Sequence, residues 1–384
     1  MSALIDGGTG RVSLAVTRSL GRRGVRVSVV SGKRYALCFY SRYCTDRILL
    51  SREPSSVFAS KMLNLIRKNK YDVLFTKGNS TIIKYREKFE KYVKLPLPSD
   101  DILGKAYNKA ETIKIAVEND IPCPETYFVK GANEVRKLRE KLEYPVVIKP
   151  RIGSGSEGIK YVNSPEELLP CYREVAASYK NPLIQEYIPN GGAYGLEALF
   201  NSDSEPRAVF IHRRIREYPV TGGPSVVRES AEHPEVKKLG LRLLKALSWY
   251  GVAMVEFRID PRDKRPKLME INPRFWGSLQ LSISAGVDFP YLLYRLAVDG
   301  DVKPVLRYKL GVKCRNLFGD VRHLASVMRG IKNTTKDFRH PSRLRTLFDF
   351  LNFFEKDVCY DFFSKEDPLP AVIKILNPVI RRLK

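Results

Sequence analysis

The sequence lacks the cysteine patterns that metal sites and disulfide frameworks require. Its six cysteines form no C-x-x-C pair, and its four histidines do not combine with them into a zinc-ligand pattern. We therefore expect neither a zinc site nor a disulfide scaffold. Thiols without such a framework are typical of a reducing compartment, so the expected location is cytoplasmic.

Long apolar runs are also missing. No stretch of about 18 uninterrupted apolar residues occurs, and Ala3 to Ile5 lead directly into a glycine turn rather than into the apolar core of a signal peptide. A standard secretory signal and a membrane-spanning helix are not predicted. Internal repeats and low-complexity segments are absent too, which favours a multidomain globular protein for a chain of 384 residues.

Acidic residues are scarce relative to basic ones. The chain has 67 Lys and Arg against 42 Asp and Glu, which gives a formal charge of +25. This excess predicts attraction to phosphate-rich or otherwise anionic partners, and it acts on association rather than on the fold. Charge alone does not distinguish a small phosphate compound from a nucleic acid or an anionic membrane.

The beginning of the chain has the pattern of a parallel α/β domain. A short strand, a glycine turn, a helix and a second strand are expected within residues 3–30. Gly8 and Gly10 resemble part of a dinucleotide-binding turn, but Ser13 stands where the third glycine would be. A structural turn is therefore the preferred interpretation. A proline-rich stretch ends this region, and we predict an α/β domain of residues 1–100.

The second region opens with a helical pattern at 101–119 and continues with strands at 146–149 and 159–162. A glycine-serine loop at 151–158 joins these two strands, whereas Walker loops and Rossmann turns lead into a helix. Lys149 ends the first strand, so its ammonium and several backbone N–H groups can surround a polyphosphate. A surface hairpin with a solvated lysine explains this segment equally well when it is considered alone.

Farther along, a predicted hairpin places two carboxylates opposite each other. Equal spacing from the middle of the turn at 260–266 sets Glu256 across from Glu270. Alternation along the second strand places Asn272 on the face of Glu270 and Met269 on the other face. Facing like charges destabilise a hairpin unless a cation lies between them, and Mg²⁺ prefers such oxygen ligands. The alternative is two exposed glutamates balanced by basic neighbours.

Three motifs in a fixed order resemble the ATP-grasp superfamily. They are the strand and glycine loop that begin at Pro145, the segment Gln185 to Ile188, and the segment Met269 to Arg274. The resemblance covers roughly residues 105–300.

This resemblance implies a mixed α/β and α+β fold. An N-terminal α/β (pre-ATP-grasp) domain at 1–100 would precede an ATP-grasp domain at 101–305, whose two lobes meet at a hinge near 183–192. A basic, aromatic, helical C-terminal region would follow at 306–384.

The resemblance also implies roles for single residues. Those implied for binding ATP are Lys109, Lys149, Gly153, Ser154, Gly155, Ser156, Gly158, Glu186, Tyr187 and Ile188. Those implied for binding Mg²⁺, or Mn²⁺ in its place, are Glu256, Glu270 and Asn272. Arg274 would act as a catalytic residue that stabilises the activated acid. Ala193 stands where the family often has an acidic ribose ligand, so the ribose contact stays open.

A charged strand at 212–217 precedes a glycine turn at 221–225. Arginine side chains suit bidentate binding of carboxylate or phosphate groups. We therefore predict catalytic roles for Arg213 and Arg216, with a solvated charged face as the alternative.

The function implied by the resemblance is that of a ligase. ATP would convert a carboxylate into an acyl phosphate, which an amine or similar nucleophile would attack, with release of ADP and phosphate. Bicarbonate or carbamate, as in the carbamoyl phosphate synthetases, is an alternative acid. A basic nucleic-acid or membrane-surface adaptor with a vestigial ATP site is the alternative from another class, and the complete set of site residues argues against it.

The expected partners are therefore small-molecule carboxylate and amine substrates, without nucleic acid, and a homodimer is compatible with the sequence. In the tail, apolar residues such as Leu344, Phe348 and Leu351 recur at helical spacing beside Arg343 and Arg345. Packing onto the enzyme body is the preferred interpretation of these residues. Contact with an anionic membrane is the alternative.

Overall fold

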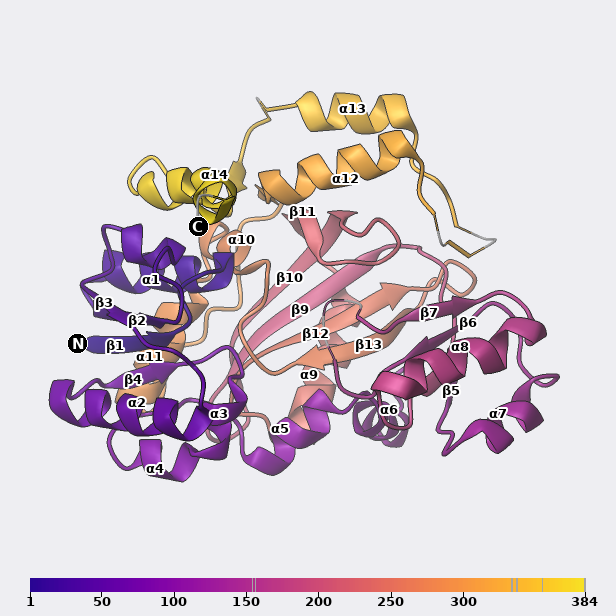
Figure 1. The fold of residues 1–384 in the computed structure, drawn as a ribbon, viewed down its shortest axis with the longest axis horizontal. Helices are drawn as coiled ribbons and strands as arrows, with labels where there is room; N and C mark the ends of the chain where they lie inside the picture. The colour runs from indigo at the N-terminus through magenta and orange to yellow at the C-terminus, as the bar shows by residue number, and fades with distance from the viewer. Residues whose placement is uncertain (154, 156, 333, 336–337, 354, 383–384) are drawn as a thin grey trace.

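The computed structural model describes residues 1–382 apart from 154, 156, 333, 336, 337 and 354. Within this part of the chain, the strands form two four-stranded sheets and one seven-stranded sheet. The seven-stranded sheet lies between the N-terminal elements and the second small sheet (Figure 1). Among the described helices, none combines the length and the apolar character needed to cross a bilayer.

The N-terminal sheet is parallel and has the strand order β3-β2-β1-β4. Alternate residues of its strands belong to different cores, as Leu4 and Ile5 show, because helix α1 covers one face and helix α2 the other. The predicted α/β class of this region is confirmed. Its elements are β1 (Ser2–Asp6), α1 (Arg11–Arg22), β2 (Arg26–Ser31), the 3-10 helix η1 (Leu37–Tyr40), β3 (Asp46–Leu49), α2 (Ser55–Asn69), β4 (Val73–Phe75), α3 (Ser80–Lys84) and α4 (Arg86–Glu90).

Two helices, α5 (Asp100–Tyr107) and α6 (Lys109–Glu118), follow where the sequence pattern predicts one. The chain is extended at Asn108, and the side chain of this residue caps α6 by accepting a hydrogen bond from the backbone nitrogen of Ala110 at 3.0 Å. This break places Lys109 in the first turn of α6.

The second sheet is antiparallel and has the order β5-β8-β6-β7. Strand β6 has the predicted bounds, and β7 starts one residue later than predicted. In β6, Val146 and Ile148 belong to the core under the helices, so Val147 and Lys149 point to the opposite face. The elements of this lobe are β5 (Thr126–Tyr127), α7 (Ala132–Leu138), β6 (Val146–Lys149), β7 (Lys160–Val162), α8 (Pro165–Ser178) and β8 (Leu183–Glu186).

The seven-stranded sheet has the order β13-β12-β9-β10-β11-β14-β15. Strands β13 to β11 in this order pair antiparallel, and helix α9 packs its apolar side against them. Its first elements and the helices that accompany them are β9 (Ala193–Phe200), β10 (Pro206–Glu217), β11 (Ser225–Ser230), α9 (Pro234–Ala246), β12 (Gly251–Ile259), β13 (Pro266–Asn272), α10 (Leu279–Ser284) and α11 (Phe289–Asp299).

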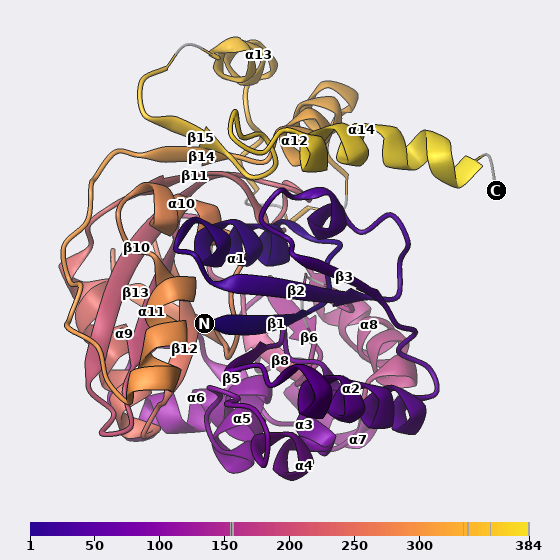
Figure 2. The ribbon, with the colours of Figure 1, turned by 90° about the vertical axis from the view of Figure 1, so that its left-hand side faces the viewer.

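The C-terminal region is helical in large part, but it also extends the central sheet. Its elements are β14 (Lys313–Arg315), α12 (Leu317–Arg329), α13 (Arg343–Leu351), β15 (Val358–Tyr360) and α14 (Leu369–Arg382). Strand β14 pairs with β11 and β15 pairs with β14, two strands that the helical prediction omitted. We therefore propose that residues 306–384 form part of the same unit as the central sheet. Figure 2 shows α12, α13 and α14 together along one side of the molecule.

The prediction that the tail packs onto the body of the protein is wrong for three apolar residues of α13. Leu344, Phe348 and Leu351 are 69%, 70% and 53% exposed. The helix is held instead by its other face, where Thr346 is buried.

Candidate active site

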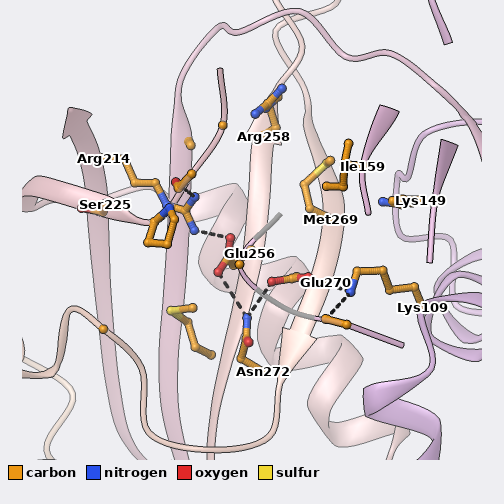
Figure 3. A pocket seen from close by; sticks show the side chains of 18 of the residues that line it. Lys109, Lys149, Ile159, Arg214, Ser225, Glu256, Arg258, Met269, Glu270 and Asn272 are labelled. Carbon is orange, nitrogen blue, oxygen red and sulfur yellow. Dashed lines mark hydrogen bonds and ion pairs between the residues drawn. The ribbon is translucent and has the colours of Figure 1, made fainter. Parts of the chain in front are cut away.

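A cavity of about 600 Å³ lies between the second sheet and the central sheet, and it reaches the N-terminal sheet. Figure 3 shows β12 and β13 on one side of it, with Lys109 and Lys149 opposite. The charged side chains that line it are Arg11, Lys77, Lys109, Lys149, Glu157, Glu186, Arg214, Glu256, Arg258, Glu270 and Arg274. Residues predicted from separate motifs therefore share one cavity.

The predicted carboxylate pair is confirmed by the register of β12 and β13. Glu256 lies directly across from Glu270, and Met254 lies across from Asn272. A β-bulge between Glu256 and Phe257 changes the register toward the turn. The bulge adds Met269 as an extra residue, so Met269 lines the cavity together with Glu270 rather than pointing to the opposite face.

Each glutamate of this pair contacts a cation. Lys109 lies 3.1 Å from Glu270 and donates a second bond to the carbonyl oxygen of Gly153 at 3.0 Å. Arg214 pairs with Glu256. Between the carboxylates, the amide nitrogen of Asn272 donates to Glu256 at 3.2 Å and to Glu270 at 3.0 Å (Figure 3). Charged groups of both signs therefore meet within one hydrogen-bonded cluster.

The two carboxylates have opposite pKa shifts. Burial raises the pKa of Glu256, and the neighbouring charge of Glu270 adds to this effect against the attraction of Arg214. Burial acts on Glu270 as well, but Lys109, Asn272 and Lys149 together outweigh it and lower the pKa of Glu270. Adjacent like charges that are kept in one site by cations are a common feature of functional sites.

Lys149 is the most deeply buried cation on the wall opposite the carboxylates. It is 5% exposed, and among the described residues no carboxylate forms an ion pair with it. Burial, together with the charge of Lys109, lowers its pKa to about 7. The interpretation as a solvated surface lysine is therefore wrong, because its ammonium is held in a protein cavity.

The glycine loop borders the cavity beside these lysines. Gly153 and Gly155 line the cavity, whereas Ser154 and Ser156 lie outside the described residues. Gly158 has a positive φ of 70°, and a Cβ atom there would lie 2.5 Å from the ring of Tyr179. Glycine is needed at this position for both conformation and space.

The predicted hinge forms one end of the cavity. Glu186, Tyr187 and Ile188 all line it, and the carbonyl oxygen of Ile188 accepts a hydrogen bond from Arg258 at 3.2 Å. Glu186 pairs with Arg262. An apolar slot edged by backbone groups suits a flat heterocyclic ring. Ala193 lines the cavity too and brings no carboxylate to it. Apolar residues that line the cavity include Val147, Ile159, Tyr187, Phe257 and Met269.

The prediction that Arg213 and Arg216 act in this site is corrected by the structure, which places neither of them in the cavity. Arg213 pairs with Glu229 at 2.6 Å on the opposite face of β10, and Arg216 binds Asp320 with two bonds of 2.7 Å.

The reason is a register shift in β10 between Arg214 and Arg216. In a regular strand Arg216 would share the face of Arg214, but the bulge turns it to the other face. Arg214, which lies between the two predicted arginines, is the one that enters the cavity.

Two further cations of the cavity come from the N-terminal region, and the sequence motifs did not indicate them. Arg11, at the start of α1, donates to Asp361 at 2.9 Å and to the backbone oxygen of Ser225 at 3.3 Å. Lys77 follows the end of β4. The carboxyl ends of parallel strands are common ligand-binding positions, which is the sequence signal that would have indicated Lys77. Arg274, which was predicted, binds the amide oxygen of Asn272 at 3.1 Å.

The donor set on β12 and β13 fits a hard divalent cation. Glu256 and Glu270 supply carboxylate oxygens that face each other, and a half-turn of the Asn272 amide would present its oxygen beside them. Among the described residues, no group of three or more His, Cys, Asp or Glu side chains is arranged around a metal position. The set is therefore of the kind that Mg²⁺ shares with substrate phosphates rather than a complete protein cage.

Comparison with known proteins identifies a family for the segment that contributes most of the cavity residues. Residues 106–278 match the family model of the ATP-grasp domain. The chain is 30% identical over 222 residues to the carbamoyl phosphate synthase large chain of Pyrococcus furiosus, a match that covers 55% of this chain and 20% of that protein. It is 26% identical over 228 residues to D-alanine–D-alanine ligase B of Clostridium tetani, a match that covers 52% of this chain and 63% of that protein. The matched part is thus less than two thirds of either relative.

A solved structure shares the fold over a greater part of the chain. Biotin carboxylase from Campylobacter jejuni, solved as a β-γ-ATP complex, superposes with a TM-score of 0.68 at 16% identity, covering 81% of this chain and 74% of that one. Similarity at this level of identity concerns the fold alone, and it confirms the predicted ATP-grasp fold. Residues 106–278, a little under half of the chain, therefore match the ATP-grasp domain, and the resemblance predicted from the sequence motifs is confirmed for this part of the chain.

Proposed function

We propose that this protein is an ATP- and Mg²⁺-dependent ligase that activates a carboxylate as an acyl phosphate for attack by an amine or similar nucleophile. The observation that carries the proposal is the cavity in which Glu256 and Glu270 on one wall face Lys109 and Lys149 on the other (Figure 3). Cations that bind phosphates and carboxylates that bind a metal ion are the two components that phosphoryl transfer requires.

The nucleotide is proposed to lie along the cavity from the hinge to the carboxylate pair. The adenine ring fits the apolar slot beside Glu186, Tyr187 and Ile188. Lys109 and Lys149 then bind the phosphates, beside Gly153 and Gly155 of the glycine loop. The side chain of Lys109 donates a hydrogen bond to the carbonyl oxygen of Gly153, and its backbone nitrogen donates to the carbonyl oxygen of Arg151. The loop and this lysine are therefore positioned together.

Glu256, Glu270 and Asn272 would hold Mg²⁺, or Mn²⁺ in its place, which neutralises charge on the polyphosphate when bound. Arg214 and Lys109 hold the two carboxylates in position at the cavity wall. The role of the protein at this point is to fix charges in place before the reaction begins.

The proposed reaction has two steps. A carboxylate oxygen of the acid attacks the γ-phosphorus, the bond between the γ-phosphorus and the β-γ bridging oxygen breaks, and ADP leaves. The amine then attacks the carbonyl carbon of the acyl phosphate, loses a proton and displaces inorganic phosphate. Arg274, which donates to Asn272, would stabilise the negative charge on the reacting acyl group.

The test is to trap the activated acid. With hydroxylamine and a panel of carboxylates that includes bicarbonate, we expect a hydroxamate from one organic acid together with stoichiometric ADP and phosphate. Formation of AMP and pyrophosphate in step with product would contradict the acyl phosphate mechanism. ADP release that depends on bicarbonate and on none of the organic acids would favour the carbamoyl phosphate synthetase-like alternative.

We also propose that the protein contacts an anionic membrane surface through α13. Leu344, Phe348 and Leu351 form an exposed apolar row next to Arg343 and Arg345, in a chain of formal charge +25. Apolar residues flanked by arginines are typical of binding to anionic lipid headgroups. The cysteines among the described residues are free, which supports contact with the cytoplasmic face of a membrane.

Co-sedimentation tests this surface. The protein should bind vesicles that contain phosphatidylserine, bind less at high salt, and not bind phosphatidylcholine vesicles. The variant Leu344→Ser/Phe348→Ser should lose binding while keeping its fold, because both side chains are exposed. If light scattering instead shows a homodimer that the same variant separates, the face is a dimer interface and the membrane proposal is wrong.

A further inference from the structure

The cavity is also lined by positive charge that lacks a matching carboxylate. Lys77 and Arg274 carry this charge. Among the described residues, neither side chain forms an ion pair with a carboxylate, and Arg274 makes its hydrogen bonds to Asn272 and to the backbone oxygen of Phe275. Two cations with no carboxylate partner therefore face the same space.

These two cations come from different sheets and are brought together by an aromatic contact. The rings of Phe75 and Phe275 stack with centroids 6.1 Å apart across the boundary between β4 and the segment after β13. Lys77 is two residues after Phe75, and Arg274 immediately precedes Phe275. Both cations line the cavity, so the stacked rings hold the two positive groups near each other.

Asp6, the carboxylate whose charge acts on Lys77, is already engaged by other donors. It accepts hydrogen bonds from Arg52 at 2.9 Å and from Asn79 at 3.0 Å. Burial lowers the pKa of Lys77, and the positive charge of Arg274 lowers it further. A half-buried positive group without its own counter-ion is costly in the free protein, and a bound anion removes that cost.

Gly10 provides the space for this ammonium. A Cβ atom at Gly10 would lie 2.9 Å from the Nζ atom of Lys77. The φ of Gly10 is −113°, which other residues adopt readily, so a side chain here would act by displacing the Lys77 ammonium rather than by straining the backbone.

We propose that the acid substrate carries a second anionic group, a carboxylate or a phosphate, and that Lys77 binds this group while Arg274 faces the reacting carboxyl. The inference rests on the proposed function, because it assigns the activated carboxyl to the space between Arg274 and the metal-binding carboxylates. Lys77 then acts as a specificity-determining residue that selects acids with two anionic groups over acids with one.

The test compares matched acids that differ by one anionic group. The probes are succinate against butyrate and 3-phosphoglycerate against glycerate, titrated by calorimetry into the full-length protein in the presence of Mg²⁺ and ADP. The wild-type protein should bind the dianionic member of at least one pair about tenfold more tightly, the size of one charge-assisted hydrogen bond. The pair that shows the preference identifies the second group as carboxylate or phosphate.

Three variants separate this role from a structural one. Lys77→Gln should remove the preference and leave the affinity for ADP unchanged, and Lys61→Gln, an exposed lysine of α2 in the same region, should change neither. Gly10→Ala should reduce the preference while keeping the charge, because the new methyl group displaces the ammonium. Equal binding within both pairs, or a preference that survives in Lys77→Gln, would overturn this inference and leave the proposed function intact. Failure of the wild-type protein to bind ADP would overturn both.

Discussion

Two regions of this molecule bury arginine and lysine side chains in different ways. At the junction between the C-terminal region and the body, buried cations have buried carboxylates: Arg228 pairs with Asp361, Arg315 with Asp320, and Arg18 with Asp367. We call this set of pairs the C-terminal ion-pair junction. In the central cavity, by contrast, Lys77, Lys149 and Arg274 lack such a partner among the described residues.

The paired charges stabilise the fold, whereas we propose that the unpaired charges of the cavity bind a ligand. Asp361 binds Arg228 and Arg11 at once, so it connects the end of β15 to β11 and to α1. A buried charge is tolerated when its partner is permanent, and the pairs of the C-terminal ion-pair junction show this case. We propose that the cavity keeps unbalanced charges because the matching groups are supplied by the substrate and the metal ion. Substitutions in the two regions should therefore affect different properties.

The largest effect on stability is expected at the C-terminal ion-pair junction. Asp361→Ala leaves the fully buried guanidinium of Arg228 without a carboxylate and should lower the free energy of unfolding by about 3–5 kcal/mol. Asp301→Ala, which removes the exposed partner of Arg207, should cost about 0–1 kcal/mol. Urea denaturation of both variants measures the comparison. Equal losses of unfolding free energy in the two variants would show that the C-terminal ion-pair junction stabilises the fold no more than an exposed ion pair does.

A loss of activity without loss of fold is expected in the cavity. Glu270→Gln keeps the volume of the side chain but removes the charge that faces Lys109 and the proposed metal ion, and it should lower Mg²⁺-dependent turnover of ATP about 100-fold or more. The matched control is Glu229→Gln, on the opposite face of the central sheet, where turnover should change little. A Glu270→Gln variant with wild-type turnover would refute the metal assignment.

A smaller, pH-dependent effect is expected at Lys149. Its pKa of about 7 lies below the ordinary lysine value, so the free protein gains stability from this group as pH rises from about 7 to 10 and loses it as pH falls. Polyphosphate restores the charged form, so nucleotide binding at about pH 8 should take up a proton, and affinity should fall as pH rises above about 7.

Calorimetry in buffers of different ionisation enthalpy measures this proton uptake. Lys149→Met should abolish it and weaken nucleotide binding by about 1–3 kcal/mol. Uptake that is unchanged in the variant would assign the proton to another group in the cavity.

Much of the fold was predictable from local patterns. The strand at Val146–Lys149 has the predicted bounds, and Glu256 lies across from Glu270 as equal spacing from the turn requires. Both features depend on neighbours within a few residues or within one hairpin, where alternation and turn length determine the geometry. The pairing of β14 with β15 was not predictable in this way, because these two short strands are far apart in the sequence and meet at the edge of a sheet that other segments build.

The sequence by itself supplied the candidate chemistry of the site, since the types and order of Lys109, Lys149, Glu256, Glu270 and Asn272 are those for which the family resemblance implies phosphate and metal binding. The tertiary structure alone decided which further cations join them. A bulge in β10 turns Arg216 away from the cavity and leaves Arg214 in it, and the contact between two sheets brings Lys77 near Arg274. Neither result follows from local pattern, because the direction of a side chain after a bulge and the approach of distant strands depend on packing across the whole molecule.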